Sequence, residues 1–237
     1  MPYSELERDR IQRFARVDPL ILLGGVCLAF VAGFVNSISL CYFHVPISHM
    51  TGAVTRLSID VAGLNFSEFM NLSYIVFGFL AGAVFSGAVI GARNFKPAIE
   101  YPILMAVESA LLFASVFLFK SKANSALFFV AFACGLQNAM ASNYMGLIIR
   151  TTHVTGIMTD LGVLIGQALR HQRVRFWKIG FLASILVGFF SGGLAGFSIF
   201  RWISFYANFV PAALCLGGAA GFWLLRVRKR RGPRAVG

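Results

Sequence analysis

Two stretches of the sequence carry the same polar residues in the same order. Each has the pattern G-x-x-N, then a gap of twelve or fourteen residues, then H-x-T-G-x-x-T. The members are Gly33, Asn36, His49, Thr51, Gly52 and Thr55 in the first stretch, and Gly135, Asn138, His153, Thr155, Gly156 and Thr159 in the second. Six identities are not expected by chance in so apolar a chain, so the sequence predicts two copies of one structural unit.

Imidazole, amide and hydroxyl groups at this spacing could bind a small polar solute. On a helix that starts near Ser48, a face repeating every three or four residues would carry His49, Arg56 and Asp60 in one stripe. The second copy would carry His153 and Asp160 in the same way. Polar stripes that face the interior of a helix bundle are typical of transport pathways, so we predict that both stripes face inward.

The start of each of these helices is also a candidate binding feature. Ser48 and Thr152 are predicted to cap the free backbone N–H groups there. A helix start inside the membrane presents the positive end of its dipole, which favours an anionic group.

Charged residues within the apolar stretches are predicted to serve coupling or gating. Arg56 and Asp160 have opposite charges at equivalent places in the two copies, which predicts an ion pair across the interface between them. Asp60, one helical turn beyond Arg56, is a competing local partner. Glu108 has no counterpart in the second copy, and because a carboxylate within a membrane span is costly, we expect it to face the protein interior.

A purely structural role stays open for most of these residues. Thr55 and Thr159 could bond back to carbonyl groups of their own helix, and Asn36 and Asn138 could only join neighbouring helices. The sequence has no H-E-x-x-H, G-x-S-x-G or nucleotide-binding loop, and its four cysteines lack metal-ligand spacing. We therefore predict no catalytic residue, no metal site and no cofactor.

The composition places all of these residues in a membrane protein. Of 237 residues, 58% are hydrophobic and only 13% are charged, and the mean hydropathy is +0.76. Stretches such as 20–38, 74–92 and 103–119 are nearly free of charge. They approach the ~20 residues that a helix needs to cross a bilayer.

These stretches predict an all-α polytopic bundle of two repeated units. The units are residues 19–122 and 123–226, with a basic amphipathic segment at 1–18 and a basic tail at 227–237. Each unit is expected to have three spans and one short or re-entrant helix, with eight full spans as the alternative. The six-span version makes the copies inverted and the eight-span version makes them parallel. The expected spans are 20–42, 72–92, 102–119, 128–144, 179–197 and 208–225, and the short helices are 48–64 and 152–169.

Small residues are expected where these spans pack together. Gly33 lies in the first span, and the second has a row of glycines at near-helical spacing, Gly78, Gly82, Gly87 and Gly91. Such residues let helix backbones approach closely where lipid provides no hydrophobic force for association.

The net charge of +12 comes from Lys and Arg grouped beside the apolar stretches. This placement fits the positive-inside rule with both termini in the cytoplasm, and the anionic lipid headgroups are the expected partners. No nucleic-acid-binding motif accompanies the charge, so nucleic acid is not expected as a partner.

At the two motifs the sequence resembles the YoaK-like family of bacterial multi-pass membrane proteins, whose shared region is a domain of unknown function. The residues that carry the resemblance are Gly33 and Asn36 with the segment 48–52, and Gly135, Gln137 and Asn138 with the segment 152–156. It covers about residues 20–225 and implies an inner-membrane location. Other members often have Asp in place of Asn36, and Asn in place of Ala53.

Three classes of function are compatible with these features. A secondary transporter or permease for a small solute, with an anionic solute as one candidate, fits the repeat, the interrupted helices and the polar stripes. A structural, assembly or sensory membrane protein is the alternative, and a membrane-embedded enzyme fits least. The prediction is a transporter with its site at the interface of the repeats; neither the solute nor the oligomeric state follows from the sequence.

Overall fold

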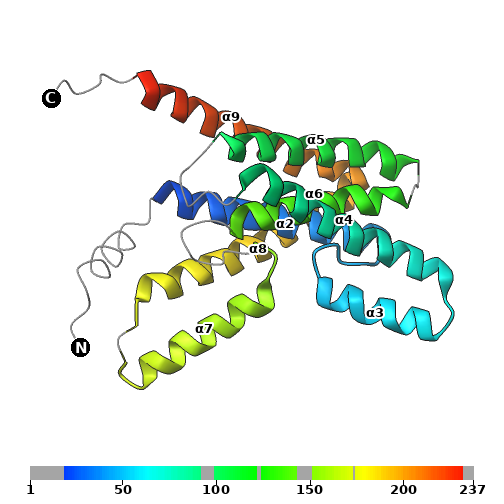
Figure 1. Ribbon diagram of the computed structural model, residues 1–237, viewed down its shortest axis with the longest axis horizontal. Helices are drawn as coiled ribbons and strands as arrows, with labels where there is room; N and C mark the ends of the chain where they lie inside the picture. Colours follow the sequence, from blue (N-terminus) through cyan, green and yellow to red (C-terminus); the bar gives the residue numbers. More distant parts are fainter. Residues whose placement is uncertain (1–18, 92–98, 122–123, 143–150, 173, 232–237) are drawn as a thin grey trace.

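The computed structural model describes residues 19–91, 99–121, 124–142, 151–172 and 174–231 (Figure 1). Over these ranges the secondary structure is helical: α2 Pro19–Phe43, α3 Met50–Ala62, α4 Phe66–Ile90, α5 Glu100–Lys120, α6 Ser125–Ser142, α7 Val154–Leu169, α8 Phe176–Ile203, the 3₁₀ helix η1 Ser204–Asn208, and α9 Phe209–Arg231. The predicted all-α class is confirmed. The basic segment 1–18 and residues 232–237 of the predicted basic tail lie outside the described residues.

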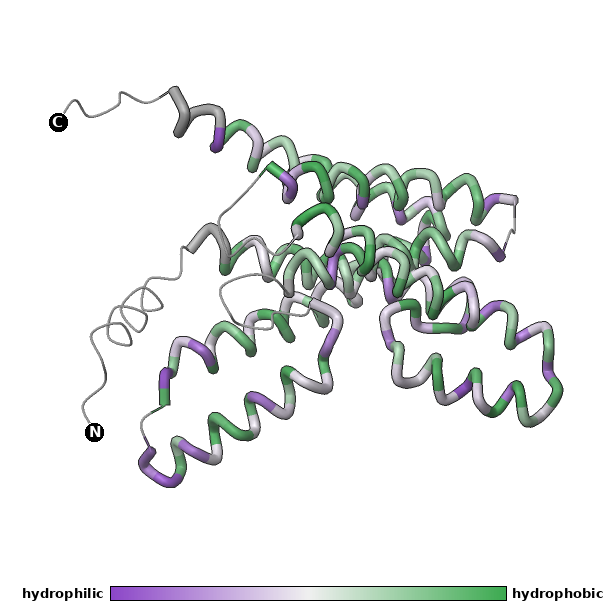
Figure 2. Tube along the Cα trace, viewed as in Figure 1, coloured by the Kyte–Doolittle hydropathy of each residue, from purple (hydrophilic) through white to green (hydrophobic). Residues whose placement is uncertain are grey.

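In the described part of the chain, six long helices form a bundle, and the two shorter helices lie beside it. Among the described residues, four stretches are long and apolar enough to cross a membrane: Leu22–Phe43, Phe66–Ile90, Glu100–Lys120 and Phe176–Arg226, the last of which contains both α8 and α9. α6 is apolar but shorter, at 18 residues or roughly 27 Å. Figure 2 shows hydrophobic residues along the bundle helices, with many of the hydrophilic ones near helix ends. The protein is therefore built as an integral membrane protein.

The bundle helices alternate in direction. α2 begins and α9 ends at the same end of the molecule (Figure 1). α2 packs along α8, α4 along α6, and α5 along α9. The first four helices, α2 to α5, and the last four, α6 to α9, thus exchange partners: the first helix of each set packs on the third helix of the other.

Glycines allow the closest of these contacts. A Cβ atom on Gly33 would collide with the carbonyl oxygen of Phe189 in α8, and one on Gly192 would collide with that of Phe30 in α2. Gly82 in α4 and Gly135 in α6 stand in the same reciprocal relation, against the carbonyl oxygens of Phe132 and Phe79. The backbones of both helix pairs are therefore in direct contact.

The predicted row of four glycines on one face of α4 is only half correct. Gly78 and Gly82 are buried against α6, but Gly87 is exposed and a Cβ atom there would meet nothing within 4 Å. The helical period places Ser86, not Gly87, on the buried face. Gly91 has a φ of 64° and follows the end of α4, where its backbone conformation favours glycine.

Candidate functional site

The first motif forms a turn that brings the chain back into the bundle. α2 ends at Phe43, and residues 44–49 are not helical. His44 has a φ of 59°, and the segment then returns along α2 until the backbone N–H and the hydroxyl of Ser48 both donate to Oδ1 of Asn36, at 3.2 and 3.0 Å. Asn36 precedes the end of α2 by seven residues, or roughly 10 Å of helix. α3 therefore starts partway along the length of the bundle and not at its end.

The second motif makes the corresponding contact. The backbone N–H of Thr152 donates to Oδ1 of Asn138 at 3.4 Å. Residues 143–150 lie outside the described part of the chain. Asn36 and Asn138 thus have the same role in the two motifs. Each accepts a hydrogen bond from the segment that precedes a short helix.

The N-cap residue of each short helix is a histidine, and not Ser48 or Thr152. His49 and His153 are the N-cap residues of α3 and α7, and neither makes a side-chain capping hydrogen bond. The predicted caps were wrong because Ser48 and Thr152 each precede the N-cap residue, and the hydroxyl of Ser48 donates to Asn36. The backbone N–H groups of the first turn in each short helix lack a side-chain cap.

Each imidazole lies over the first turn of its own helix. A Cβ atom on Gly52 would come within 2.8 Å of Nδ1 of His49, and one on Gly156 would collide with Nδ1 of His153. Both histidine side chains are exposed at the surface of the protein atoms. The glycine of the T-G pair is therefore required for the position of the imidazole.

The threonine hydroxyls are satisfied within their helices. Thr55 donates to the carbonyl oxygen of Thr51 at 2.9 Å, and Thr159 donates to that of Thr155 at 3.0 Å. All four threonines are exposed. For Thr55 and Thr159 the structure favours the alternative of bonding back to the same helix.

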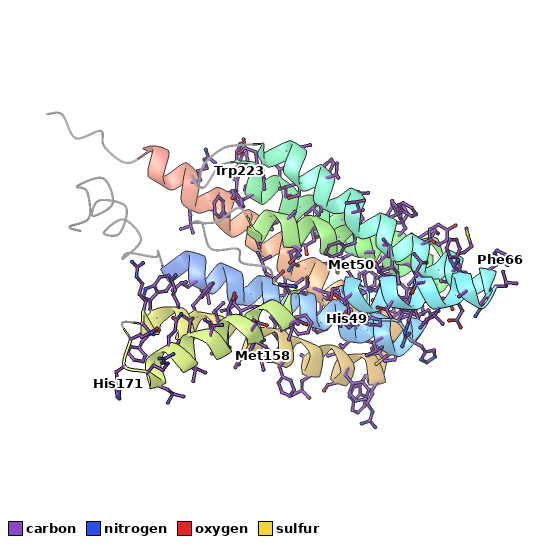
Figure 3. The ribbon with its side chains drawn as sticks, turned by 60° about the horizontal axis from the view of Figure 1, so that its bottom comes forward. His49, Met50, Phe66, Met158, His171 and Trp223 are labelled. Atoms are coloured by element: carbon purple, nitrogen blue, oxygen red, sulfur yellow. The ribbon has the colours of Figure 1, made fainter. Side chains whose placement is uncertain are left out.

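The two short helices run from the middle of the molecule toward opposite ends. Figure 3 places His49, at the start of α3, near the centre, while Phe66, just beyond α3, and His171, just beyond α7, lie at opposite ends. α3 packs against α4, and α7 packs against α8. Ala53 is the buried residue of α3 and Ile157 that of α7.

This arrangement corrects the predicted inward stripes. Arg56 and Asp160 are exposed, and Asp60 is half-buried. Over their described residues α3 and α7 do not contact each other, so the predicted ion pair between Arg56 and Asp160 is not formed. A long Arg side chain near the outer half of a membrane helix can extend to the interface, which removes the need for an internal partner.

Glu108 lies inside the bundle, as predicted. Its side chain is 1% exposed, and it packs where α5 meets α6 and α9, beside Cys134 and within hydrogen-bonding reach of the Cys215 thiol. Its Oε2 atom has no hydrogen-bond partner among the described residues. An ionised carboxylate without a cation at this depth would cost several kcal/mol.

Sequence reasoning missed one polar contact within the second motif. Nε2 of Gln137 donates to the carbonyl oxygen of Leu28 in α2, at 2.7 Å, and to Oγ1 of Thr151, at 3.0 Å. Gln137 is 1% exposed and Thr151 is fully buried. A comparison of the two motifs could have revealed this contact. The polar residues Gln137 and Thr151 stand where the first motif has two apolar residues, Val35 and Ile47.

Comparison with known proteins gives one family. The family described as "Protein of unknown function (DUF1275)" matches residues 24–221, which contain both motifs and all the bundle helices except the ends of α2 and α9. Neither a curated protein nor a solved structure matches the chain.

Proposed function

The chain belongs to the DUF1275 family, whose function is not known, and from its geometry we propose that it is a secondary transporter or permease for a small solute. One observation carries the proposal: two short helices begin beside the bundle, at the middle of its length, and run toward opposite ends of the molecule. Irregular backbone at membrane depth is tolerated where it is buried in protein or lines a water-filled cavity. Helices that are interrupted in this way form the binding sites of many transporters.

We propose further that α2 to α5 and α6 to α9 are inverted copies of one unit. The equivalent bonds from Ser48 to Asn36 and from Thr152 to Asn138 support this, as do the reciprocal glycine contacts of the two helix pairs. Three spans per copy would give the inversion, and the opposite directions of α3 and α7 agree with it. The solute would then bind between the starts of α3 and α7.

An anionic solute is the best chemical match to this site. The uncapped N–H groups at the start of each short helix attract negative charge, and the imidazoles of His49 and His153 can donate hydrogen bonds. Because the site offers only two helix starts and two imidazoles as donors, a small carboxylate or phosphate fits better than a large polyanion.

A bacterial inner membrane with both termini in the cytoplasm is the proposed location. The start of α2, the end of α9 and the connection between α7 and α8 lie at one end of the molecule (Figure 1). That connection and the start of α8 carry Arg170, Arg175 and Lys178. A basic end of this kind is expected on the cytoplasmic side, facing anionic headgroups.

Gly52→Ala and Gly156→Ala are expected to lower solute uptake at least tenfold without changing the melting temperature by more than about 2 °C. Each new methyl group would displace an imidazole, and a side chain can move without disturbing the fold. Uptake into proteoliposomes would be screened with monocarboxylates, dicarboxylates, phosphate, amino acids and sugars, with and without a pH gradient. The control is Gly162→Ala in α7, where a Cβ atom meets nothing within 4 Å.

Two results would count against the proposal in different ways. Uptake by the wild type of no solute in the panel would favour the alternative of a structural, assembly or sensory protein. Equal uptake by Gly52→Ala, Gly156→Ala and Gly162→Ala would show instead that the imidazoles have no part in transport.

Glu108→Gln is expected to remove the dependence of uptake on the pH gradient while the protein stays folded. The amide keeps the shape of the carboxyl group but cannot carry a proton to and from the bundle interior. Glu68→Gln, the same change at an exposed site in the first turn of α4, is the control and should behave as the wild type. If uptake by Glu108→Gln responds to pH as the wild type does, Glu108 has no coupling role.

A further inference from the structure

Three polar side chains are completely enclosed where α2, α5 and η1 meet. Ser39 in α2, Ser115 in α5 and Asn208 in η1 each have 0% exposure. Over the described residues, Oγ of Ser39 and both polar atoms of the Asn208 amide have no hydrogen-bond partner. Buried polar groups are nearly always paired, so these atoms require an explanation.

An aromatic contact one helical turn away brings the three elements together. The rings of Tyr42, Phe119 and Phe205 lie against one another, with centroid separations of 5.1, 5.6 and 6.1 Å. The Tyr42 hydroxyl also donates to the carbonyl oxygen of Phe119 at 3.1 Å. The faces of α2, α5 and η1 that carry these rings therefore meet.

Each enclosed polar residue lies on the same face of its element as one of these rings. Ser39 precedes Tyr42 by three residues, Ser115 precedes Phe119 by four, and Asn208 follows Phe205 by three. These separations correspond to one turn of an α-helix or of a 3₁₀ helix. Because α2 and α5 both end where α9 begins (Figure 1), Ser39 and Ser115 lie one turn further from that end than their rings, and Asn208 directly precedes α9.

The two serine hydroxyls differ in their hydrogen bonds, but both have free lone pairs. Ser115 donates its proton to the carbonyl oxygen of Leu112 at 2.6 Å, which leaves the lone pairs of its oxygen free. Ser37 and Ser191 bond back to their own helices in the same way, but Ser39 does not. Ser39, Ser115 and the amide of Asn208 together offer three neutral oxygen atoms.

Neutral oxygen atoms of this kind suit a monovalent cation. Divalent cations are usually held by carboxylates, which none of these three residues provides. The end of α8 lies close by: the helix stops at Ile203, Ser204 has a φ of 52°, and η1 then leads into α9. Carbonyl groups at helix ends coordinate sodium in transporters, and the end of α8 is directly followed by η1.

We propose that Ser39, Ser115 and Asn208 form a binding site for a sodium ion, between α2, α5 and the junction of α8 with α9. The Tyr42–Phe119–Phe205 contact covers the site on the side that faces the end of the molecule. The proposal concerns binding, so it holds or fails whether or not the protein is the transporter proposed above.

Sodium is expected to raise the melting temperature of the purified protein in detergent. At about ten times the dissociation constant, the rise should be roughly 3 to 6 °C over the same concentration of potassium or choline chloride. Trp177, Trp202 and Trp223 provide the fluorescence signal. The increase should saturate with sodium concentration, since a specific site is being filled.

Ser39→Ala and Asn208→Ala should each abolish the sodium-dependent rise, because each removes one of the oxygen ligands. Ser191→Ala, which removes a hydroxyl bonded within its own helix, should keep it. If Asn208→Ala does not fold, Ser39→Ala alone decides the matter, since loss of an unpaired hydroxyl should not harm the fold. Equal melting temperatures of the wild type in sodium, potassium and choline would overturn the proposal and leave water as the occupant, and so would an unchanged rise in Ser39→Ala.

Discussion

Gly82→Leu and Gly192→Leu are each expected to prevent stable folding of the bundle. The collision in both variants is with a backbone carbonyl oxygen of the partner helix, Phe132 for Gly82 and Phe30 for Gly192. A backbone cannot move aside as a side chain can, so the helix pair must separate along its length. Even Gly192→Ala should lose about 3 kcal/mol of unfolding free energy or more, at the upper end of overpacking effects.

Each substitution has a control on the same helix. Gly87 in α4 and Gly180 in α8 are exposed, and a Cβ atom on either meets nothing within 4 Å. Gly87→Leu and Gly180→Leu should therefore give a single symmetric peak in gel filtration and an unfolding midpoint in dodecyl sulfate close to that of the wild type. Similar behaviour of Gly82→Leu and Gly87→Leu would mean that α4 and α6 are not in backbone contact.

Apolar length and the repeated motif together predicted the helices well. The expected span 20–42 is α2, Pro19–Phe43, and the expected short helix 152–169 is α7, Val154–Leu169. Three boundaries were wrong by six residues: α8 ends at Ile203 and not at 197, α9 ends at Arg231 and not at 225, and α4 begins at Phe66 and not at 72. The first turn of α4 carries polar residues that resemble a loop. Apolar length determines where a membrane helix can form, and this property is local in sequence.

Which side of a helix packs against the bundle was less predictable from the sequence. α3 has a polar and an apolar stripe, and the polar one with Arg56 was expected to face the bundle. In a soluble protein the apolar stripe would face the core, but in a membrane lipid is as apolar as a protein interior, so the pattern does not select a neighbour. The structure leaves Arg56 exposed and buries Ala53.

Most of the candidate site depends on contacts that no single stretch reveals. The repeated motif contains Asn36 and His49, but it did not show that Asn36 holds Ser48. The three residues of the proposed sodium site are separated by most of the chain and belong to no motif. Buried polar groups of this kind emerge only when the helices are assembled.

Exchange of one buried pair tests the proposed repeat most directly. Gln137 and Thr151 are joined by a hydrogen bond in the second motif, at 3.0 Å. Under the repeat their equivalents are Val35 and Ile47, which are 1% and 0% exposed and belong to one apolar cluster. Equivalent positions in the two copies would then be filled by a polar pair in one copy and by an apolar pair in the other.

The single substitutions Gln137→Val and Thr151→Ile are each expected to lower the unfolding free energy by about 1 to 3 kcal/mol, because each leaves a buried polar group without its partner. The double substitution installs the pair that the first motif already has. It should recover at least about 1 kcal/mol of the summed losses, since no polar side chain is then left unpaired. The measurement is a double-mutant cycle in mixed micelles titrated with dodecyl sulfate, with Thr155→Val as an exposed control for the loss of a hydroxyl in α7. Strictly additive losses in the double variant would show that residues 35 and 47 are not structural equivalents of 137 and 151, and the two-copy interpretation of the bundle would lose its most specific support.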